Sequence, residues 1–370
     1  MPDERSSGAS RNVERVAQSL FSDSSERQRF LDALQSKEAS ITAVAALRGG
    51  LFEGSSAQGP TWLPEWISVA KEEERPGKSD RHDQGELYCL DLSSTFACAA
   101  YSQVQGPVGV AVDLCAAPGG KSIVASRYLS PRFLVANEVI RKRTAQLISN
   151  YKRCQIDPSI VTSRDPGNLA KLMPEAAQLV VADVPCSGQS LVLKGLAAPG
   201  AFHPATISMN ARRQRRIMAC AAQLLSQGGY LLYSTCTFSR EENEENIEWF
   251  LGRHPEFSAV AVPLLDPFRS AHSAQPLYRL FPQSGFGAGA FCALLRRHGE
   301  ASADGMARTI EDLTDTIKPI WRSPTVFKLL PAPVRSDDRQ DGRRPERRQR
   351  KGGWDRARGR AQRFRADDHE

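Results

Sequence analysis

The chain has 370 residues, of which 41% are hydrophobic, and a formal net charge of +7. This length suggests one catalytic domain with appendages, and the hydrophobic content is enough for a sizeable core. No run of about 18 apolar residues predicts a membrane span, and the polar N-terminus lacks the apolar stretch of a signal peptide. We therefore expect a cytoplasmic protein that does not cross a membrane.

The positive charge is concentrated near the C-terminus. Residues 343–365 contain eleven Lys and Arg against two acidic residues, so the rest of the chain is close to neutral. The net charge therefore says little about nucleic-acid binding by that remainder. The eight cysteines form no C-x-x-C pair, and the six histidines do not cluster near them. We expect reduced thiols and no metal site.

The predicted elements begin with one helix around residues 26–34, and residues 61–86 read as connecting structure. From residue 108 onward strands and helices alternate. Strands are expected at 108–114, 133–137, 160–162, 178–183, 230–235 and 290–295, and helices at 120–129, 139–153, 206–226 and 240–252. Gly228-Gly229 would end the third helix, and a capping box of Ser239 and Glu242 would open the fourth. This alternation favours an α/β fold with a doubly wound, mostly parallel sheet.

These patterns divide the chain into four parts: an N-terminal region (1–105), a catalytic domain (106–298), a weakly patterned extension (299–333) and an Arg-rich tail (334–370). The tail is nearly devoid of aliphatic residues, so we expect it to be disordered. Its Trp354 and Phe364 are interleaved with Arg and Gly, which suits non-specific contact with phosphates and stacked bases. A solvated tail without function is almost as good an interpretation.

A glycine turn follows the first strong strand, in the segment D-L-C-A-A-P-G-G-K-S that begins at Asp113. Ligands of open parallel sheets lie beyond the carboxyl ends of the strands, and the amides of a following helix add donors. Glu138 ends the second strand, where an acid can hold ribose hydroxyls, and Asp165 follows the third strand, placed to meet an adenine edge. The turn lacks the third glycine of a dinucleotide fingerprint and is not a Walker loop.

Two cysteines follow the next strands, Cys186 in D-V-P-C-S-G and Cys236 in Y-S-T-C-T-F-S-R-E-E-N-E. Together with the glycine turn and A-N-E-V-I-R-K-R, they occur in the order and spacing of the Nop/Sun (RsmB-like) RNA cytosine-5 methyltransferases. Over about residues 87–296 the chain resembles that family, and A-N-E-V-I-R is most similar to its bacterial RsmF-type ribosomal-RNA enzymes. The resemblance implies a class I, Rossmann-like methyltransferase fold that uses S-adenosyl-L-methionine.

The resemblance also implies roles for individual residues. The cofactor would be held by residues of the glycine turn and by three acids: Cys115, Ala116, Ala117, Pro118, Gly119, Gly120, Lys121, Glu138, Asp165 and Asp183. The catalytic nucleophile would be Cys236, and Cys186 would help to release the product. We read the other cysteines as small buried hydrophobes, except Cys115 in the turn.

The chemistry explains why such residues are needed. C5 of cytosine becomes nucleophilic only after a thiolate has added to C6, and cysteine is strongly nucleophilic even when partly ionised. Asp183 is the candidate to hold N3 and N4 of the base. Lys121 could assist the developing charge or lower the pKa of a thiol. Cys186 is placed for the loss of the C5 proton and the expulsion of Cys236.

The chain departs from the family pattern in its N-terminal region, where the family binds RNA. In the element Tyr-x-Gln-Asp/Glu-x-Ser-Ser, Leu90 replaces the Gln. The Arg-x-Asn signature is not recognisable in residues 41–48. These differences concern recognition of the RNA more than the reaction.

Other functions compete with this interpretation. A DNA cytosine-5 methyltransferase would attack with the P-C cysteine and carry an E-N-V strand, which is missing here. A transfer-RNA enzyme and a non-catalytic ribosome-assembly factor remain alternatives. We expect an RNA partner, ribosomal rather than transfer RNA, no membrane or metal, and a monomer.

Overall fold

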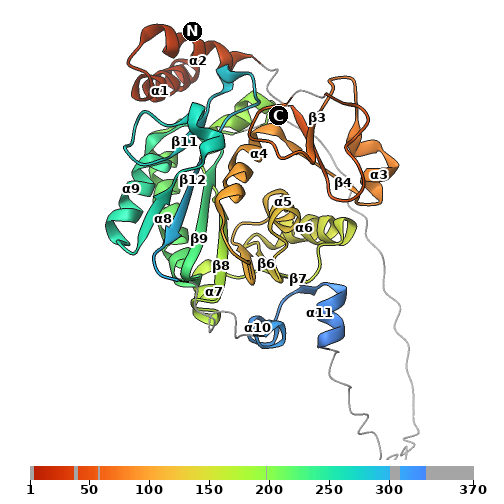
Figure 1. Ribbon diagram of the computed structural model, residues 1–370. Coiled ribbons are helices and arrows are strands. Elements are labelled where there is room, and N and C mark those ends of the chain that lie inside the picture. Colours follow the sequence, from red (N-terminus) through yellow and green to blue (C-terminus); the bar gives the residue numbers. More distant parts are fainter. Residues whose placement is uncertain (1–3, 37–40, 57–58, 197, 301–308, 331–370) are drawn as a thin grey trace, which may run out of the picture. The chain divides into compact units, whose positions relative to one another are not determined.

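The structure is a computed structural model that describes residues 4–36, 41–56, 59–196, 198–300 and 309–330, with side chains from residue 11 onward (Figure 1). The tail expected at 334–370 and residues 301–308 of the expected extension lie outside the described residues. Within the described ranges, no helix is both long and apolar enough to span a membrane.

A nine-stranded sheet forms the centre of the fold, in the order β10-β12-β9-β8-β5-β6-β7-β13, with β11 on β12. Five neighbouring strands are parallel: β5 (Val110–Asp113), β6 (Phe133–Asn137), β7 (Ser159–Thr162), β8 (Ala177–Asp183) and β9 (Leu225–Thr235). The edges are antiparallel: β12 (Ala290–Arg297), β10 (Phe257–Val260), β11 (Tyr278–Leu280) and β13 (Trp321–Arg322). The predicted α/β fold is confirmed.

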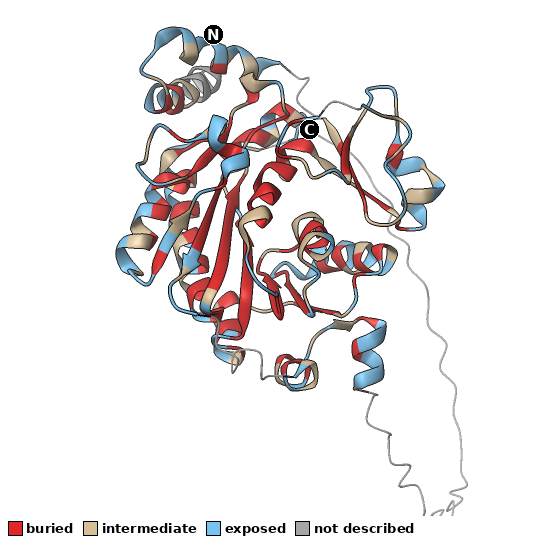
Figure 2. Ribbon diagram, in the orientation of Figure 1, coloured by how far each residue is buried: buried red, intermediate tan, exposed pale blue. Residues whose placement is uncertain are grey.

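Both faces of this sheet are covered, and the parallel strands β5, β6 and β7 are wholly buried (Figure 2). Side chains alternate between the faces, so Ala111 and Val112 of β5 belong to different apolar clusters. One face is covered by α4 (Leu92–Cys98), α5 (Gly120–Leu129) and α6 (Arg141–Cys154), and the other by α7 (Pro166–Leu172), α8 (Pro204–Leu224) and α9 (Glu244–Arg253). This double cover explains why the strands are apolar throughout.

Two predicted boundaries were wrong. The third helix ends at Leu224, and Gly228 lies inside β9, where its φ of 73° accompanies a break in register between β8 and β9. Such a bulge needs a residue that tolerates a left-handed conformation, as glycine does. Helix α9 begins at Glu244 behind a short 3₁₀ turn, η4 (Arg240–Glu242). Ser239 does not cap it, because its hydroxyl donates to the side chain of Glu242 instead.

The N-terminal region contains more structure than the sequence pattern indicated. Helices α1 (Glu4–Leu20) and α2 (Ser24–Gln35) precede a four-stranded antiparallel sheet, β2-β3-β1-β4. Its strands are β1 (Thr42–Ala46), β2 (Ser55–Ser56), β3 (Ile67–Ala70) and β4 (Leu87–Asp91). They escaped prediction because no regular alternation of strands and helices surrounds them, and because β1 reads Thr-Ala-Val-Ala-Ala, in which Ala, a residue depleted in strands, predominates.

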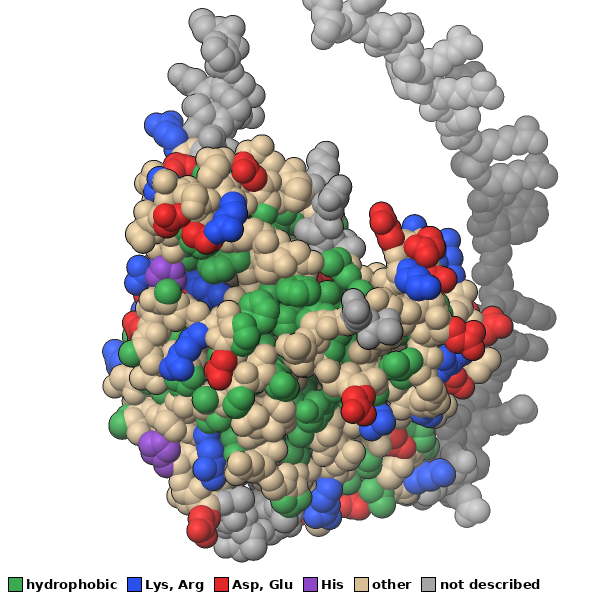
Figure 3. Space-filling view, turned by 45° about the horizontal axis from the view of Figure 1, so that its top comes forward, with side chains coloured by type: hydrophobic (Ala, Val, Ile, Leu, Met, Phe, Trp, Pro, Cys, Tyr) green, Lys and Arg blue, Asp and Glu red, His purple; other side chains and the backbone are tan. Residues whose placement is uncertain are grey.

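The remaining elements are short and lie between or after these strands and helices. They are α3 (Asp80–Asp83), α10 (Ile310–Ile317), α11 (Pro324–Leu329) and the 3₁₀ turns η1 (Pro76–Lys78), η2 (Ala99–Gln103), η3 (Gln189–Lys194), η5 (Pro263–Phe268) and η6 (Pro282–Ser284). On the face drawn in Figure 3, acidic and basic side chains are intermixed around a central apolar area. That face is therefore not uniformly basic.

A candidate active site at the ends of the parallel strands

A cavity of about 480 Å³ lies at the carboxyl ends of the parallel strands. Most of the predicted site residues line it: Cys115, Ala117, Lys121, Glu138, Asp165, Asp183, Cys186 and Cys236. Ala116, Pro118 and Gly120 line an adjoining cavity of about 330 Å³, which shares Lys121 and Asp183 with the first. Parallel strands end at one edge of a sheet, so residues far apart in sequence meet there.

The remaining predicted residue, Gly119, shapes the turn and lines neither of these cavities. Its φ is 110°, and it caps the N-terminus of α5. A Cβ atom at this position would lie 3.0 Å from Leu147 and 3.1 Å from Tyr151 of α6. Glycine is therefore required both by the backbone conformation and by the close packing of the turn against α6.

Glu138 presents an unused acceptor to the cavity. Its side chain is buried, and Oε1 accepts a hydrogen bond of 2.9 Å from the backbone N–H of Ile140. Oε2 has no hydrogen-bond partner among the described residues, although Arg143 Nη1 forms an ion pair with it at 3.2 Å. A buried acceptor with spare capacity suits a ligand hydroxyl. This observation fits the predicted binding of a ribose.

Asp165 lies on the same side of the cavity. Its Oδ1 accepts a hydrogen bond from the backbone N–H of Gly167 and so caps α7. Arg216 of α8 pairs with the carboxylate, and this hydrogen bond is the main cause that lowers the pKa of Asp165. Asp165 therefore carries a negative charge at neutral pH at the wall that Glu138 shares.

The two thiols meet on the other side of the cavity. Cys186 Sγ lies 3.2 Å from Cys236 Sγ, and their loops follow the neighbouring strands β8 and β9. The hydrogen bond with Cys186 lowers the pKa of Cys236, and Ser190 and Lys121 lower it further, against burial and Asp183. The same hydrogen bond, with burial, raises the pKa of Cys186 well above its ordinary value. Cys236 is therefore the thiol that ionises first, with Cys186 as its donor.

A cation stands beside the ionising thiol. Lys121 Nζ lies 2.7 Å from Asp183 Oδ2, and Ser234 donates a hydrogen bond of 2.7 Å to Asp183 Oδ1. Burial works against the ammonium of Lys121, but Asp183 and neighbouring thiols outweigh it and raise the pKa of Lys121. The lysine is therefore protonated, with the carboxylate of Asp183 and the thiols of Cys98 and Cys236 near it.

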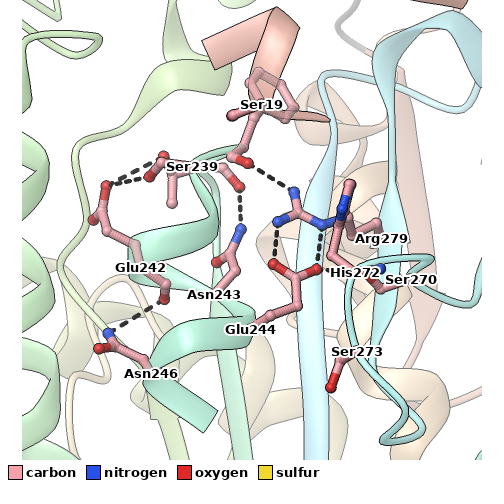
Figure 4. Close-up of polar contacts among 12 residues, drawn as sticks. Ser19, Ser239, Glu242, Asn243, Glu244, Asn246, Ser270, His272, Ser273 and Arg279 are labelled. Carbon is pink, nitrogen blue, oxygen red and sulfur yellow. Dashed lines mark hydrogen bonds and ion pairs between the residues drawn. The ribbon is translucent and has the colours of Figure 1, made fainter. Parts of the chain in front are cut away.

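The segment after Cys236 is held by buried polar contacts, which Figure 4 shows. Arg279 of β11 forms a buried ion pair with Glu244 and donates to the carbonyl of Phe238 at 2.7 Å. Asn243 donates to the carbonyl of Thr237 at 2.9 Å. These contacts fix the backbone directly after Cys236.

Sequence reasoning missed several residues of the site. Lys194 lines the main cavity and pairs at 3.0 Å with Asp91, which caps α4 at the end of the N-terminal sheet. Glu242 was read as a capping residue, but it contacts the loop of Cys186. No motif marks Lys194, whereas the Asp-x-Ser-Ser element from Asp91 to Ser94 could have been a signal. In the described part of the chain, no group of three or more His, Cys, Asp or Glu side chains could hold a metal.

Comparison with known proteins places this site in a family context. The family described as 16S rRNA methyltransferase RsmB/F matches residues 107–296. Ribosomal RNA small subunit methyltransferase F of Cronobacter sakazakii is 34% identical over 245 residues, which cover 64% of this chain and 50% of that protein. The Escherichia coli O157:H7 protein of the same name is 33% identical over 244 residues, with the same shares. The chain thus spans about half the length of the curated relatives that it matches.

Solved structures agree with the fold. The structure reported as Crystal Structure of PH0851 has a TM-score of 0.66 and 25% identity, over 77% of this chain and 65% of that chain. NSun6 from Pyrococcus horikoshii with SFG has a TM-score of 0.61 and 16% identity, over 78% of this chain and 98% of that chain. At the latter identity the likeness concerns the fold alone.

Proposed function

Because the chain belongs to the 16S rRNA methyltransferase RsmB/F family, we propose that it transfers a methyl group to C5 of a cytosine in ribosomal RNA. The observation that carries this proposal is the pair of thiols 3.2 Å apart, of which only Cys236 has a lowered pKa. The proposal concerns the part of the chain that is shared with the curated relatives, which are about twice as long as that shared part.

The cofactor is S-adenosyl-L-methionine, which supplies an activated methyl group when it is bound. In the proposed arrangement, residues 115–121 and the spare acceptor of Glu138 hold it, and Asp165 faces its base. The glycine turn supports this assignment, because it brings backbone and the N-terminus of α5 close to the cavity.

In the first step the thiolate of Cys236 adds to C6 of the cytosine. Electron density moves from the C5–C6 double bond toward N3 and O2, and C5 becomes a nucleophile. Asp183 accepts a hydrogen bond from the N4 amino group, and the ammonium of Lys121 stabilises the developing negative charge. The pair of Lys121 and Asp183 at 2.7 Å supports these roles.

The second step restores the aromatic base once C5 has received the methyl group and still carries its own proton. Once Cys236 Sγ is bonded to C6, it no longer carries the charge that raises the pKa of Cys186. Cys186 can then lose its proton to water and, as a thiolate, remove the proton from C5. The electron pair of that C–H bond forms the C5–C6 double bond, and Cys236 leaves as a thiolate.

Methyl transfer from tritium-labelled cofactor would test this function. The full chain is incubated with unmodified small-subunit ribosomal RNA, with 30S subunits and with bulk transfer RNA, and the product nucleosides are identified by mass spectrometry. We expect 5-methylcytosine in ribosomal RNA. Labelling of transfer RNA alone would overturn the choice of substrate, and labelled bases other than 5-methylcytosine would overturn the reaction.

A further inference from the structure

One buried carboxylate contacts the loops of both thiols. Glu242 of η4 is fully buried, and no Lys or Arg of the described residues forms an ion pair with it. Its Oε2 accepts hydrogen bonds from the backbone N–H of Ser187 at 2.9 Å and from the side-chain amide of Gln214 at 2.8 Å. Its Oε1 accepts one from the hydroxyl of Ser239 at 3.0 Å, as Figure 4 shows.

These partners belong to the segments that carry the thiols. Ser187 directly follows Cys186, and Thr237, which directly follows Cys236, donates to Glu242 Oε1 at 3.4 Å. The hydroxyls of Ser187 and Thr237 lie 2.7 Å apart. Gln214 of α8 also donates to the carbonyl of Pro185 at 3.0 Å. The carboxylate is therefore the point at which the two loops and α8 are joined.

Burying a carboxylate without a neighbouring cation costs free energy, because the group loses its hydration. Hydrogen bonds from the protein must offset that cost. If the position required only packing, an apolar residue of similar size would fill it without this desolvation penalty. We propose that Glu242 is a positioning residue. It holds the loops of Cys186 and Cys236 in the relative position that brings their sulfur atoms together. This inference rests on the proposed function, in which Cys236 is the reactive thiol.

The charge of Glu242 has a second effect. It adds to the hydrogen bond and burial that raise the pKa of Cys186, and so helps to keep that thiol a proton donor. The other charged groups that act on the two thiols are Lys121 of α5 and Asp183 at the end of β8. Tyr233 of β9 lies against Glu242 on the opposite side, where its hydroxyl donates to the Glu242 carbonyl.

Two substitutions separate geometry from charge. In Glu242→Gln the amide oxygen can accept from Ser187 and Gln214, and the amide nitrogen can donate to the hydroxyls of Ser239 and Thr237. In Glu242→Ala both the negative charge and the hydrogen bonds to the carboxylate are lost. The matched control is Glu245→Gln, which removes an exposed carboxylate three residues further along the chain.

The readout is the alkylation of the full-length protein by iodoacetamide between pH 6 and 10, with Cys186 and Cys236 quantified by peptide mass spectrometry. We expect Glu242→Ala to slow alkylation of Cys236 at neutral pH by about tenfold, as a rise of about one pKa unit requires. Glu242→Gln should restore the rate to within about threefold of the control, because the register is kept. In Glu242→Gln the alkylation of Cys186 at pH 10 should become faster, because the loss of a negative neighbour lowers the pKa of that thiol.

An unchanged Cys236 rate in a folded Glu242→Ala protein, checked by melting and by cofactor affinity, would overturn the inference. If Glu242→Ala does not fold, two other variants decide. An unchanged alkylation rate of Cys186 at pH 10 in Glu242→Gln, together with an unchanged alkylation rate of Cys236 in Thr237→Val, would refute the inference. Alkylation needs no RNA, so a failure of the wild-type protein to form 5-methylcytosine would refute the proposed function without affecting this test.

Discussion

Lys121 Nζ lies 2.7 Å from Asp183 Oδ2, so the first turn of α5 is tied to the end of β8. The lysine side chain is 12% exposed and the aspartate side chain 41%, which leaves the carboxylate able to contact a substrate. The pair places a cation in the cavity that both thiols line. Asp183 neutralises this cation, because an unpaired charge in a buried position would cost free energy.

Replacing Lys121 by Met should make Cys236 less reactive. The ammonium lowers the pKa of Cys236, so its removal raises that pKa and reduces the thiolate fraction at a given pH. The alkylation midpoint of Cys236 should move to higher pH. Lys142→Met, which removes an exposed cation from α6, should leave the midpoint in place. Equal profiles for Lys121→Met and wild type would remove Lys121 from the activation of the thiol.

Cys236→Ala should abolish methyl transfer and leave the affinity for S-adenosyl-L-methionine nearly intact. In the proposed mechanism Cys236 contacts the base, whereas Glu138 and residues 115–121 hold the cofactor. Tritium transfer measures the first property and calorimetry the second. Turnover that persists in this variant would contradict the assignment of Cys236.

Cys186→Ala should have a different effect. Attack by Cys236 and methyl transfer can proceed, but removal of the C5 proton stalls, so a covalent complex of enzyme and RNA should accumulate. A band of reduced mobility in a denaturing gel, sensitive to ribonuclease, would report it. If the complex formed with Cys236→Ala instead, the roles of the two thiols would be exchanged.

Glu138→Gln should weaken the binding of the cofactor and leave the affinity for RNA unchanged. A carboxylate can accept from both ribose hydroxyls, whereas the amide keeps one acceptor and the cap on Ile140. Loss of a hydrogen bond to a charged acceptor costs about 1.5–3 kcal/mol, or about ten- to a hundredfold in affinity. Calorimetry with S-adenosyl-L-methionine checks the value. An unchanged dissociation constant would assign the spare acceptor to another ligand.

Deleting residues 334–370 should keep the fold, because that stretch contains few apolar residues. If its cations contact phosphates, the deletion should raise the dissociation constant for RNA and flatten the slope of log affinity against log salt. Turnover at saturating RNA should barely change, because both thiols precede residue 240. Equal salt slopes for the two proteins would show that the tail does not contact the RNA.

The five parallel strands of the large sheet, and the edge of that sheet at which the candidate site lies, could be predicted from the sequence. The alternation of strand and helix patterns predicts the parallel strands, and the carboxyl ends of parallel strands lie at one edge of the sheet. That rule is enough to predict that Cys186, Cys236 and Glu138 lie near the glycine turn. Local signals were weaker where they competed with tertiary contacts, as at Ser239, whose hydroxyl binds a side chain instead of capping a helix.

The sequence by itself determined which chemical groups are present and the edge of the sheet at which they gather, because hydrophobic periodicity and turn residues act locally. Only the tertiary structure decided which thiol ionises first. That depends on the 3.2 Å contact between Cys186 and Cys236, on the cation of Lys121, and on the carboxylate of Glu242, which joins both loops. These contacts link residues up to 115 positions apart, from Lys121 to Cys236, and burial sets their strength, so no local pattern in the chain encodes them.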